Sequence, residues 1–170
     1  MLSEETAMGK YPAETVAMMA RIATSIERRY RPFKFSRHLM EHFKGNGTAG
    51  KTSVEDQVSV NVVESMRSLG VRFILTPTES GNTARRIARF KPDSWILAFG
   101  PHPATHEFLA LSYGVWSCLG IQCGRNGWEQ PVLDFVKRHA LARPGEKLIL
   151  TEGGISGKPG STDTMRVIVK

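Results

Sequence analysis

Five residues between positions 78 and 83 have the types and spacing that a phosphate site requires. They lie in the stretch ILTPTESGNTARRIARF (74–90) and are Thr78, Ser80, Gly81, Asn82 and Thr83. Hydroxyl and amide groups donate hydrogen bonds to phosphate oxygens, and glycine lets the backbone approach a ligand closely. Small polar residues are also common at helix starts, where the Ser80 side chain would cap the first N–H groups. The stretch therefore supports two interpretations, a phosphate site and a simple helix cap.

A second glycine-rich stretch, GNGTAGKT at 45–52, matches the pattern of a nucleotide-binding P-loop. In that motif Lys51 would contact the outer phosphates and Thr52 would bind magnesium. The motif requires a buried strand that runs into its first glycine, whereas the preceding SRHLMEHFK is charged and helical in character. We interpret 45–52 as a connector in which Thr52 or Ser53 caps the next helix. A P-loop nucleotide-binding module stays as the alternative.

The charge of the chain favours anionic partners, because the formal net charge is +7 at pH 7. The densest basic group is RRYRPFKFSRH at 28–38, where aromatic residues stand between the charges, as they do in surfaces that bind single-stranded nucleic acid. No recognised nucleic-acid motif accompanies this group. We favour a helix end followed by a linker and keep a basic nucleic-acid-binding surface as a further alternative.

Histidine and cysteine spacing predicts no metal site. The pairs His38/His42 and His102/His106 are each four residues apart without a third ligand, and we interpret both as surface pairs. Cys118 and Cys123 fit neither a metal-binding pattern nor a disulfide framework, so both are expected to be reduced. We expect no cofactor in this chain.

Strands and helices alternate in the hydrophobic pattern after residue 70. The predicted strands are 71–77, 94–100, 114–120, 146–153 and 164–170, and the predicted helices between them are 81–90, 103–113 and 129–141. Two earlier helices are expected at 12–30 and from Thr52 to Gly70. This order predicts an α/β three-layer sandwich: a mostly parallel sheet of about five strands, the last one antiparallel, with helices on both faces and an extra N-terminal helix. Ligands of such sheets bind at the carboxyl ends of the strands, where residues 78–83 would lie.

The chain has no feature of a membrane or exported protein. Hydrophobic residues make up 41% of its 170 residues, no apolar run approaches the roughly 20 residues of a membrane span, and MLSEETAMGK lacks a signal pattern. We therefore expect a cytoplasmic protein.

Three segments of the chain match motifs of one known family. The first, MLSEETAMGKYPAETVAMMARIA, resembles the segment that closes the catalytic barrel of pyruvate kinases. The second, TPTESGNTARRIARFKP, resembles the T-x-S-G-x-T-A segment of their C-terminal domain, and the third, ILTEGGISGKPGSTDTMRV, resembles its closing glycine-rich loop and last strand. The likeness runs in order over nearly the whole chain, which is identified as a member of that family. It implies a barrel remnant at 1–30, a linker at 31–53 and a C-terminal α/β domain at 54–170.

The resemblance implies a site for a phosphorylated effector. The residues at 78–83 named above would cradle the phosphate, and Arg125 in CGRNGW (123–128) is a further candidate ligand. A loop over the site would supply a cation, Lys158, and comprises Gly154, Ser156, Gly157, Lys158 and Gly160. Some animal enzymes have a lysine where Glu79 stands, so the resemblance favours a sugar monophosphate or nucleotide over a sugar bisphosphate.

The resemblance also implies that this chain is not catalytic by itself. The family transfers a phosphoryl group from phosphoenolpyruvate to ADP with Mg and K ions held in the barrel, upstream of the segments matched here. Ser3, Glu5 and Thr6 match the end of the barrel, and Glu4 replaces the commoner glycine. The chain would be part of such an enzyme or a free-standing product that kept its regulatory and oligomerisation domain. An apolar stripe on the helix 12–30, which the barrel would otherwise help to cover, predicts a homo-oligomer; its members are Val16, Met19, Ala23, Ile26 and Tyr30.

Overall fold

The computed structural model of the chain describes residues 2–29, 41, 52–124, 127–153 and 162–170. The chain divides into two compact units, residues 1–31 and 32–170. Within the described ranges, none of the helices has the length and apolar character needed to cross a membrane.

The N-terminal unit contains a short helix, α1 (Glu4–Ala7), and a long one, α2 (Pro12–Arg29). Pro12 opens α2, because the first helical position needs no N–H donor, and Glu14 places a carboxylate in the positive first turn. The predicted stripe residues Val16, Met19 and Ile26 are about half exposed to solvent. Within its own unit, this side of α2 is therefore left largely uncovered.

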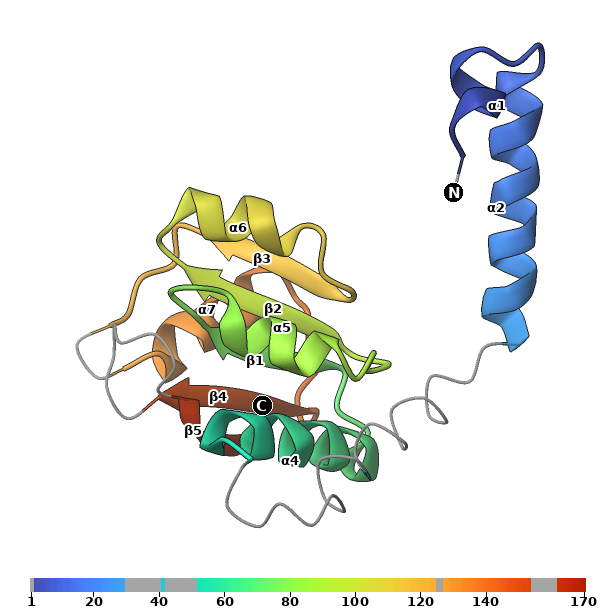
Figure 1. Cartoon of the computed structure of the whole chain (residues 1–170). Helices are drawn as coiled ribbons and strands as arrows, with labels where there is room; N and C mark the ends of the chain where they lie inside the picture. The colour runs from blue at the N-terminus through green and yellow to red at the C-terminus, as the bar shows by residue number, and fades with distance from the viewer. Residues whose placement is uncertain (1, 30–40, 42–51, 125–126, 154–161) are drawn as a thin grey trace. The chain divides into compact units, whose positions relative to one another are not determined.

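The C-terminal unit is a five-stranded sheet with four helices among its described residues (Figure 1). In chain order it contains α4 (Val54–Leu69), β1 (Phe73–Pro77), α5 (Asn82–Ala88), β2 (Trp95–Gly100), α6 (Pro103–Leu109), β3 (Val115–Leu119), α7 (Glu129–Arg138), β4 (Lys147–Gly153) and β5 (Thr162–Val169). The strand order is β3-β2-β1-β4-β5. All neighbours pair in parallel except β4 and β5, which are antiparallel. The predicted α/β fold with an antiparallel last strand is confirmed.

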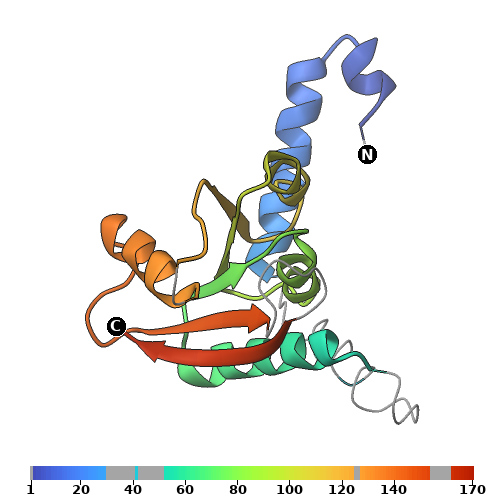
Figure 2. The same ribbon diagram turned by 90° about the vertical axis from the view of Figure 1, so that its left-hand side faces the viewer.

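The sheet separates two hydrophobic cores, because alternate side chains of a strand point to opposite faces. Ile74, Ile96 and Ile149 pack under α4, α5 and α6, whereas Leu75 and Leu97 pack under α7. Thus α4, α5 and α6 lie on one face of the sheet and α7 lies on the other, as Figures 1 and 2 show.

Capping residues set the ends of α4. Ser53, and not Thr52, occupies the cap position, where its hydroxyl accepts a hydrogen bond from the Asp56 N–H at 3.1 Å. Gly70 ends the helix in the left-handed conformation with φ +66°.

Several other elements are shorter than the hydrophobic pattern predicted: α6 ends at Leu109 rather than 113, and α7 ends at Arg138 rather than 141.

Candidate functional site

The predicted phosphate residues lie where the carboxyl end of β1 meets the start of α5. The Thr78 N–H donates to the Phe99 carbonyl at 2.7 Å, so the loop leaving β1 lies against the end of β2. Gly100 permits this approach, because a Cβ at that position would overlap the Thr78 carbonyl oxygen. The loop is therefore held at the edge where ligands of parallel sheets bind.

Gly81, and not Ser80, occupies the cap position of α5. Its φ is +78°, and no side chain in the described ranges caps this helix. The Gly81 N–H donates to the Thr78 hydroxyl at 2.8 Å, which closes the loop without using the helical amides that follow. The interpretation of Ser80 as a simple helix cap is wrong, because the chain enters α5 through a left-handed glycine.

Thr83 connects the start of α5 to β5. Its hydroxyl lies 2.6 Å from the hydroxyl of Thr162, and both residues are buried. Thr162 directly follows residues 154–161 in the chain, and it opens β5. The first turn of α5 is consequently fixed to the sheet from the side opposite β2, whereas Asn82 is exposed.

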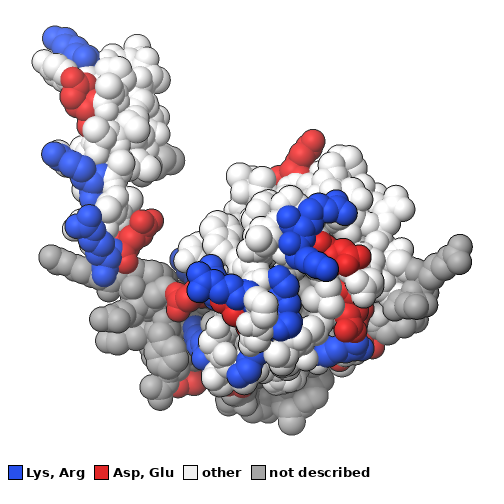
Figure 3. All heavy atoms as spheres, turned by 180° about the vertical axis from the view of Figure 1, so that it is seen from behind, with Lys and Arg blue, Asp and Glu red and all other residues white. Residues whose placement is uncertain are grey.

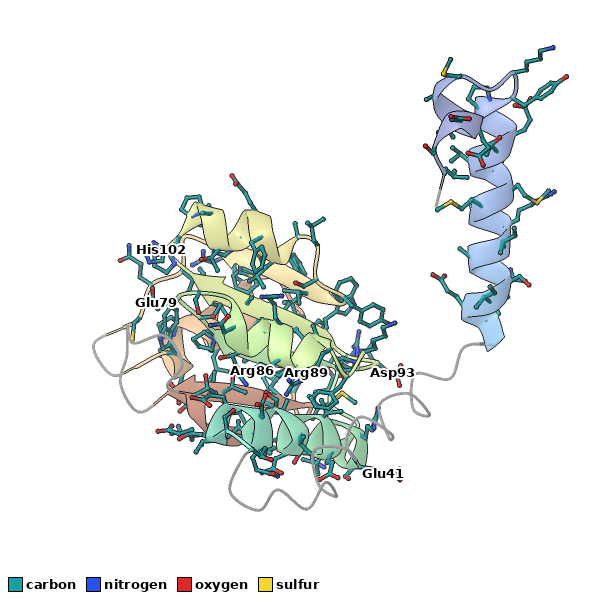
Figure 4. The ribbon with its side chains drawn as sticks, in the orientation of Figure 1. Glu41, Glu79, Arg86, Arg89, Asp93 and His102 are labelled. Carbon is teal, nitrogen blue, oxygen red and sulfur yellow. The ribbon has the colours of Figure 1, made fainter. Side chains whose placement is uncertain are left out.

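Three side-chain interactions fasten the loop 78–81 and the end of β2 to α6. The Thr105 hydroxyl donates to the Glu79 carbonyl at 2.8 Å, and His102 Nε2 lies 3.1 Å from the Glu79 carboxylate (Figure 4). His106 Nε2 lies 2.9 Å from the Gly100 carbonyl oxygen. The prediction that His102 and His106 form a surface pair is wrong for His106, which is 8% exposed. No sequence signal identified Thr105, whose partner lies 26 positions away.

An ionic cluster lies behind α5, between this helix and α4. Asp56 Oδ1 accepts hydrogen bonds from Arg86 and Arg89, each at 2.5 Å. Burial by itself raises the pKa of Asp56, but the hydrogen bonds from Arg86, Arg89 and Ser53 outweigh it and hold the pKa below its ordinary value. Asp56 is therefore ionised at neutral pH.

Several sequence-predicted residues lie outside the described ranges. These are Lys51 and most of the P-loop pattern, His38 and His42, Arg125, the basic stretch 30–38, and the covering-loop residues Gly154, Ser156, Gly157, Lys158 and Gly160. Among the residues that the structure does describe, no group of histidine, cysteine, aspartate and glutamate side chains is arranged to hold a metal ion.

The face of the C-terminal unit that points away from the viewer in Figure 1 carries mixed charges. Figure 3 shows lysine and arginine side chains interleaved with aspartate and glutamate over this face. Ion pairs of the same unit also mix the two signs: Arg166 pairs with Glu129 and lies 3.9 Å from Glu152, and Arg72 lies 3.7 Å from Glu146. Over the residues that the structure describes, this view shows no broad surface of a single sign.

A comparison with known families decides the relationship. The family described as "Pyruvate kinase, alpha/beta domain" matches residues 56–168. The chain belongs to this family. Its sequence is 37% identical over 168 residues to a pyruvate kinase of Thermococcus litoralis, covering 98% of this chain and 34% of that one. It is 32% identical over 170 residues to pyruvate kinase 2 of a Synechocystis species, covering 99% of this chain and 27% of that one.

A solved structure supports the fold of this pyruvate kinase domain. The crystal structure of a pyruvate kinase from Cryptosporidium parvum superposes with a TM-score of 0.73 at 24% identity, covering 99% of this chain and 32% of that one. The resemblance found in the sequence is confirmed. The chain spans about a third of the length of these relatives.

Proposed function

We propose that this pyruvate kinase domain is regulatory and binds a phosphorylated effector at the start of α5. The observation that carries the proposal is a helix start entered through Gly81, with no side-chain cap among the described residues, in a family member whose sequence carries T-x-S-G-x-T-A at that place. The first N–H groups of a helix have no intrahelical acceptor, and the helix dipole adds partial positive charge there. A bound oxyanion accepts hydrogen bonds from these N–H groups, and its negative charge interacts favourably with the helix dipole.

The contacts of the loop suggest how each residue would contribute. The Thr78 oxygen accepts from the Gly81 N–H, which leaves its own hydrogen to donate to a ligand. The Thr83 hydroxyl is shared with Thr162, so Thr83 would contribute its backbone N–H. Asn82 is exposed and Ser80 is half-buried, so both can donate from their side chains.

Glu79 supports an effector with a single phosphate. Its carboxylate lies 3.1 Å from His102 and its side chain is 27% exposed. A carboxylate beside the cradle repels additional phosphate charge. We therefore infer a sugar monophosphate, or a nucleotide with a single phosphate in the cradle, and expect a sugar bisphosphate to bind more weakly.

Phosphoryl transfer from phosphoenolpyruvate to ADP belongs, in this proposal, to the full-length protein. The chain covers about a third of its relatives' length, and no metal-binding group occurs in its described part. We expect the purified chain to show no turnover in a coupled assay with phosphoenolpyruvate, ADP, Mg²⁺ and K⁺. Turnover by this chain alone would contradict that assignment.

The variant Asn82→Asp tests the effector site separately from folding. A carboxylate in the first turn of α5 interacts favourably with the helix dipole. The variant should therefore be at least as stable as the wild type, with a gain of up to about 0.3–1 kcal/mol. The same charge should repel phosphate and weaken binding at least tenfold. Binding is measured by calorimetry with glucose 6-phosphate, ribose 5-phosphate, AMP and fructose 1,6-bisphosphate.

Lys51→Ala is the control for the P-loop alternative. It should leave effector affinity unchanged, whereas a P-loop would lose nucleotide binding with this substitution. Equal affinity of wild-type and Asn82→Asp chains for every ligand would overturn the proposed site.

A further inference from the structure

Four side chains connect α5 to the first turn of α4. Asp56 Oδ1 accepts from Arg86 Nη1 and from Arg89 Nη2, both at 2.5 Å. The second Asp56 oxygen accepts from the Ser53 hydroxyl at 2.8 Å. Figure 4 places both arginines between α5 and α4. One carboxylate thus receives hydrogen bonds from two helices.

The cluster includes the N-terminal cap of α4 itself. The Ser53 oxygen accepts from the Asp56 N–H at 3.1 Å and from Arg86 Nη1 at 3.2 Å. An arginine of α5 therefore shares the atom that caps α4. Displacing α5 would disturb this cap directly, because charge-assisted hydrogen bonds depend strongly on distance and angle.

Arg86 is also close to the proposed effector site along α5. It follows Asn82 by four residues, so the two lie on the same face of the helix, one turn apart. Helical side chains lean toward the N-terminus, which brings the aliphatic part of the Arg86 side chain over the first turn of α5. Arg86 lies within the seven-residue helix and Arg89 is its C-cap residue, so a shift of the first turn would move both.

The Asp56 side chain is buried enough that water does not readily replace its hydrogen-bond partners. It is 17% exposed, whereas the Arg86 and Arg89 side chains are 34% and 30% exposed. Water can replace Asp56 as the partner of the arginines more easily than it can replace the arginines around Asp56. The carboxylate is therefore the residue to change in a test, because its removal leaves two guanidinium groups that can be hydrated.

We propose that Asp56 is the joint through which a ligand at the start of α5 tightens the first turn of α4. This inference rests on the proposed function, because it assigns a regulatory consequence to that site. Ser53 is the N-cap residue of α4, the helix that precedes β1. Effector binding at α5 would therefore be felt at the start of α4.

Hydrogen exchange of the full chain with and without inorganic phosphate tests this joint. Phosphate should slow exchange of the amides at 82–84, which would contact the ligand. It should also slow exchange at 56 and 57, whose N–H groups donate to the Ser53 side chain and carbonyl. We expect slowing of about fivefold or more at both places, a typical size for coupled sites.

Asp56→Asn should separate the two effects. Protection at 82–84 should persist, and protection at 56 and 57 should be lost. Glu55→Gln is the matched control, because it removes a carboxylate from the same turn of α4 and should preserve both effects. If Asp56 only supported the fold, Asp56→Asn would change the exchange rates of amides 56 and 57 by the same factor with and without phosphate.

The outcomes separate this inference from the proposed function. If phosphate protects 82–84 but not 56 and 57 in the wild-type chain, or if Asp56→Asn keeps protection at both, the joint is overturned and the effector site stands. If phosphate protects neither stretch in any variant, the effector site fails and the joint fails with it.

Discussion

At the scale of single residues, Gly81 has the most demanding backbone conformation in the proposed site. Its φ is +78°, and an added Cβ would lie 3.0 Å from Leu109 Cδ2, a side chain that is fully buried. We expect Gly81→Ala to lower the free energy of unfolding by about 1–3 kcal/mol, because left-handed conformations are costly for residues with a Cβ. It should also weaken phosphate binding, since the amides of α5 would shift. Urea unfolding and calorimetric titration measure the two effects.

Gly70→Ala is the control for this substitution. Gly70 has φ +66°, and nothing lies within 4 Å of an added Cβ. It should cost about 1–2 kcal/mol through backbone strain alone and leave phosphate affinity unchanged. If both glycine variants bind phosphate like the wild type, Gly81 has no role beyond the turn.

The lowered pKa of Asp56 predicts that the stability of the fold depends on pH. Its folded-state pKa lies below the ordinary value of 3.8, so the unfolded chain takes up the proton first as the pH falls. The stabilisation is complete well above pH 3.8 and decreases as the pH falls through the folded-state pKa. At pH 7 Asp56→Asn should lower the free energy of unfolding by about 1–3 kcal/mol, less than for a fully buried pair. Urea unfolding at pH 7, 5 and 3 should show a difference that is constant between 7 and 5 and smaller at 3.

Residue types identified the loop of the site but not its supports. Thr78, Ser80, Gly81, Asn82 and Thr83 follow an apolar run within a few positions, so their proximity needs no knowledge of the fold. Thr105 and Thr162 reach the same loop from 26 and 79 positions away, to Glu79 and Thr83 respectively. Contacts of that kind depend on strand order, and one sequence does not specify which side chains the order brings together.

At the scale of elements, short apolar runs and helical periodicity identified each strand and the larger helices among the residues that the structure describes. The predicted ends were less accurate where capping decides them. The helix predicted at 81–90 is Asn82–Ala88, and the helix predicted at 103–113 is Pro103–Leu109. Residues beyond these ends, such as Phe90, are buried without being helical. Apolar periodicity therefore overestimates helix length where a helix is followed by a turn that still contacts the core.

The Thr83–Thr162 hydrogen bond should measurably join α5 to β5. Thr83→Val or Thr162→Val leaves the other hydroxyl buried without its partner, which should cost about 1–2 kcal/mol. The double variant should cost less than the sum of the two single variants, with a coupling of about 0.5–1.5 kcal/mol. Thr164→Val, an exposed position in the same strand, should change stability by less than about 0.5 kcal/mol. Additive losses in urea unfolding would show that the two hydroxyls do not interact.

At the scale of the whole molecule, the two units differ in how their apolar residues are covered. The C-terminal unit buries large aliphatic side chains on both faces of its sheet. In the N-terminal unit, α2 leaves Val16, Met19, Ile22 and Ile26 about half exposed. Since the chain spans about a third of its relatives, we infer that the rest of a full-length pyruvate kinase would cover this side of α2.

Without that cover, the chain should self-associate through α2. Exposed apolar groups gain about 25 cal/mol for each Å² that is removed from water, and two copies can bury one another's stripe. Light scattering coupled to size exclusion should give a mass above that of the monomer, and Met19→Lys with Ile22→Lys should return it toward the monomer. Ala17→Lys is the control, because residue 17 lies on the other side of the helix and should leave the mass unchanged. A monomeric mass for the wild-type chain at every concentration would contradict this prediction and would mean that the exposed stripe is tolerated in water.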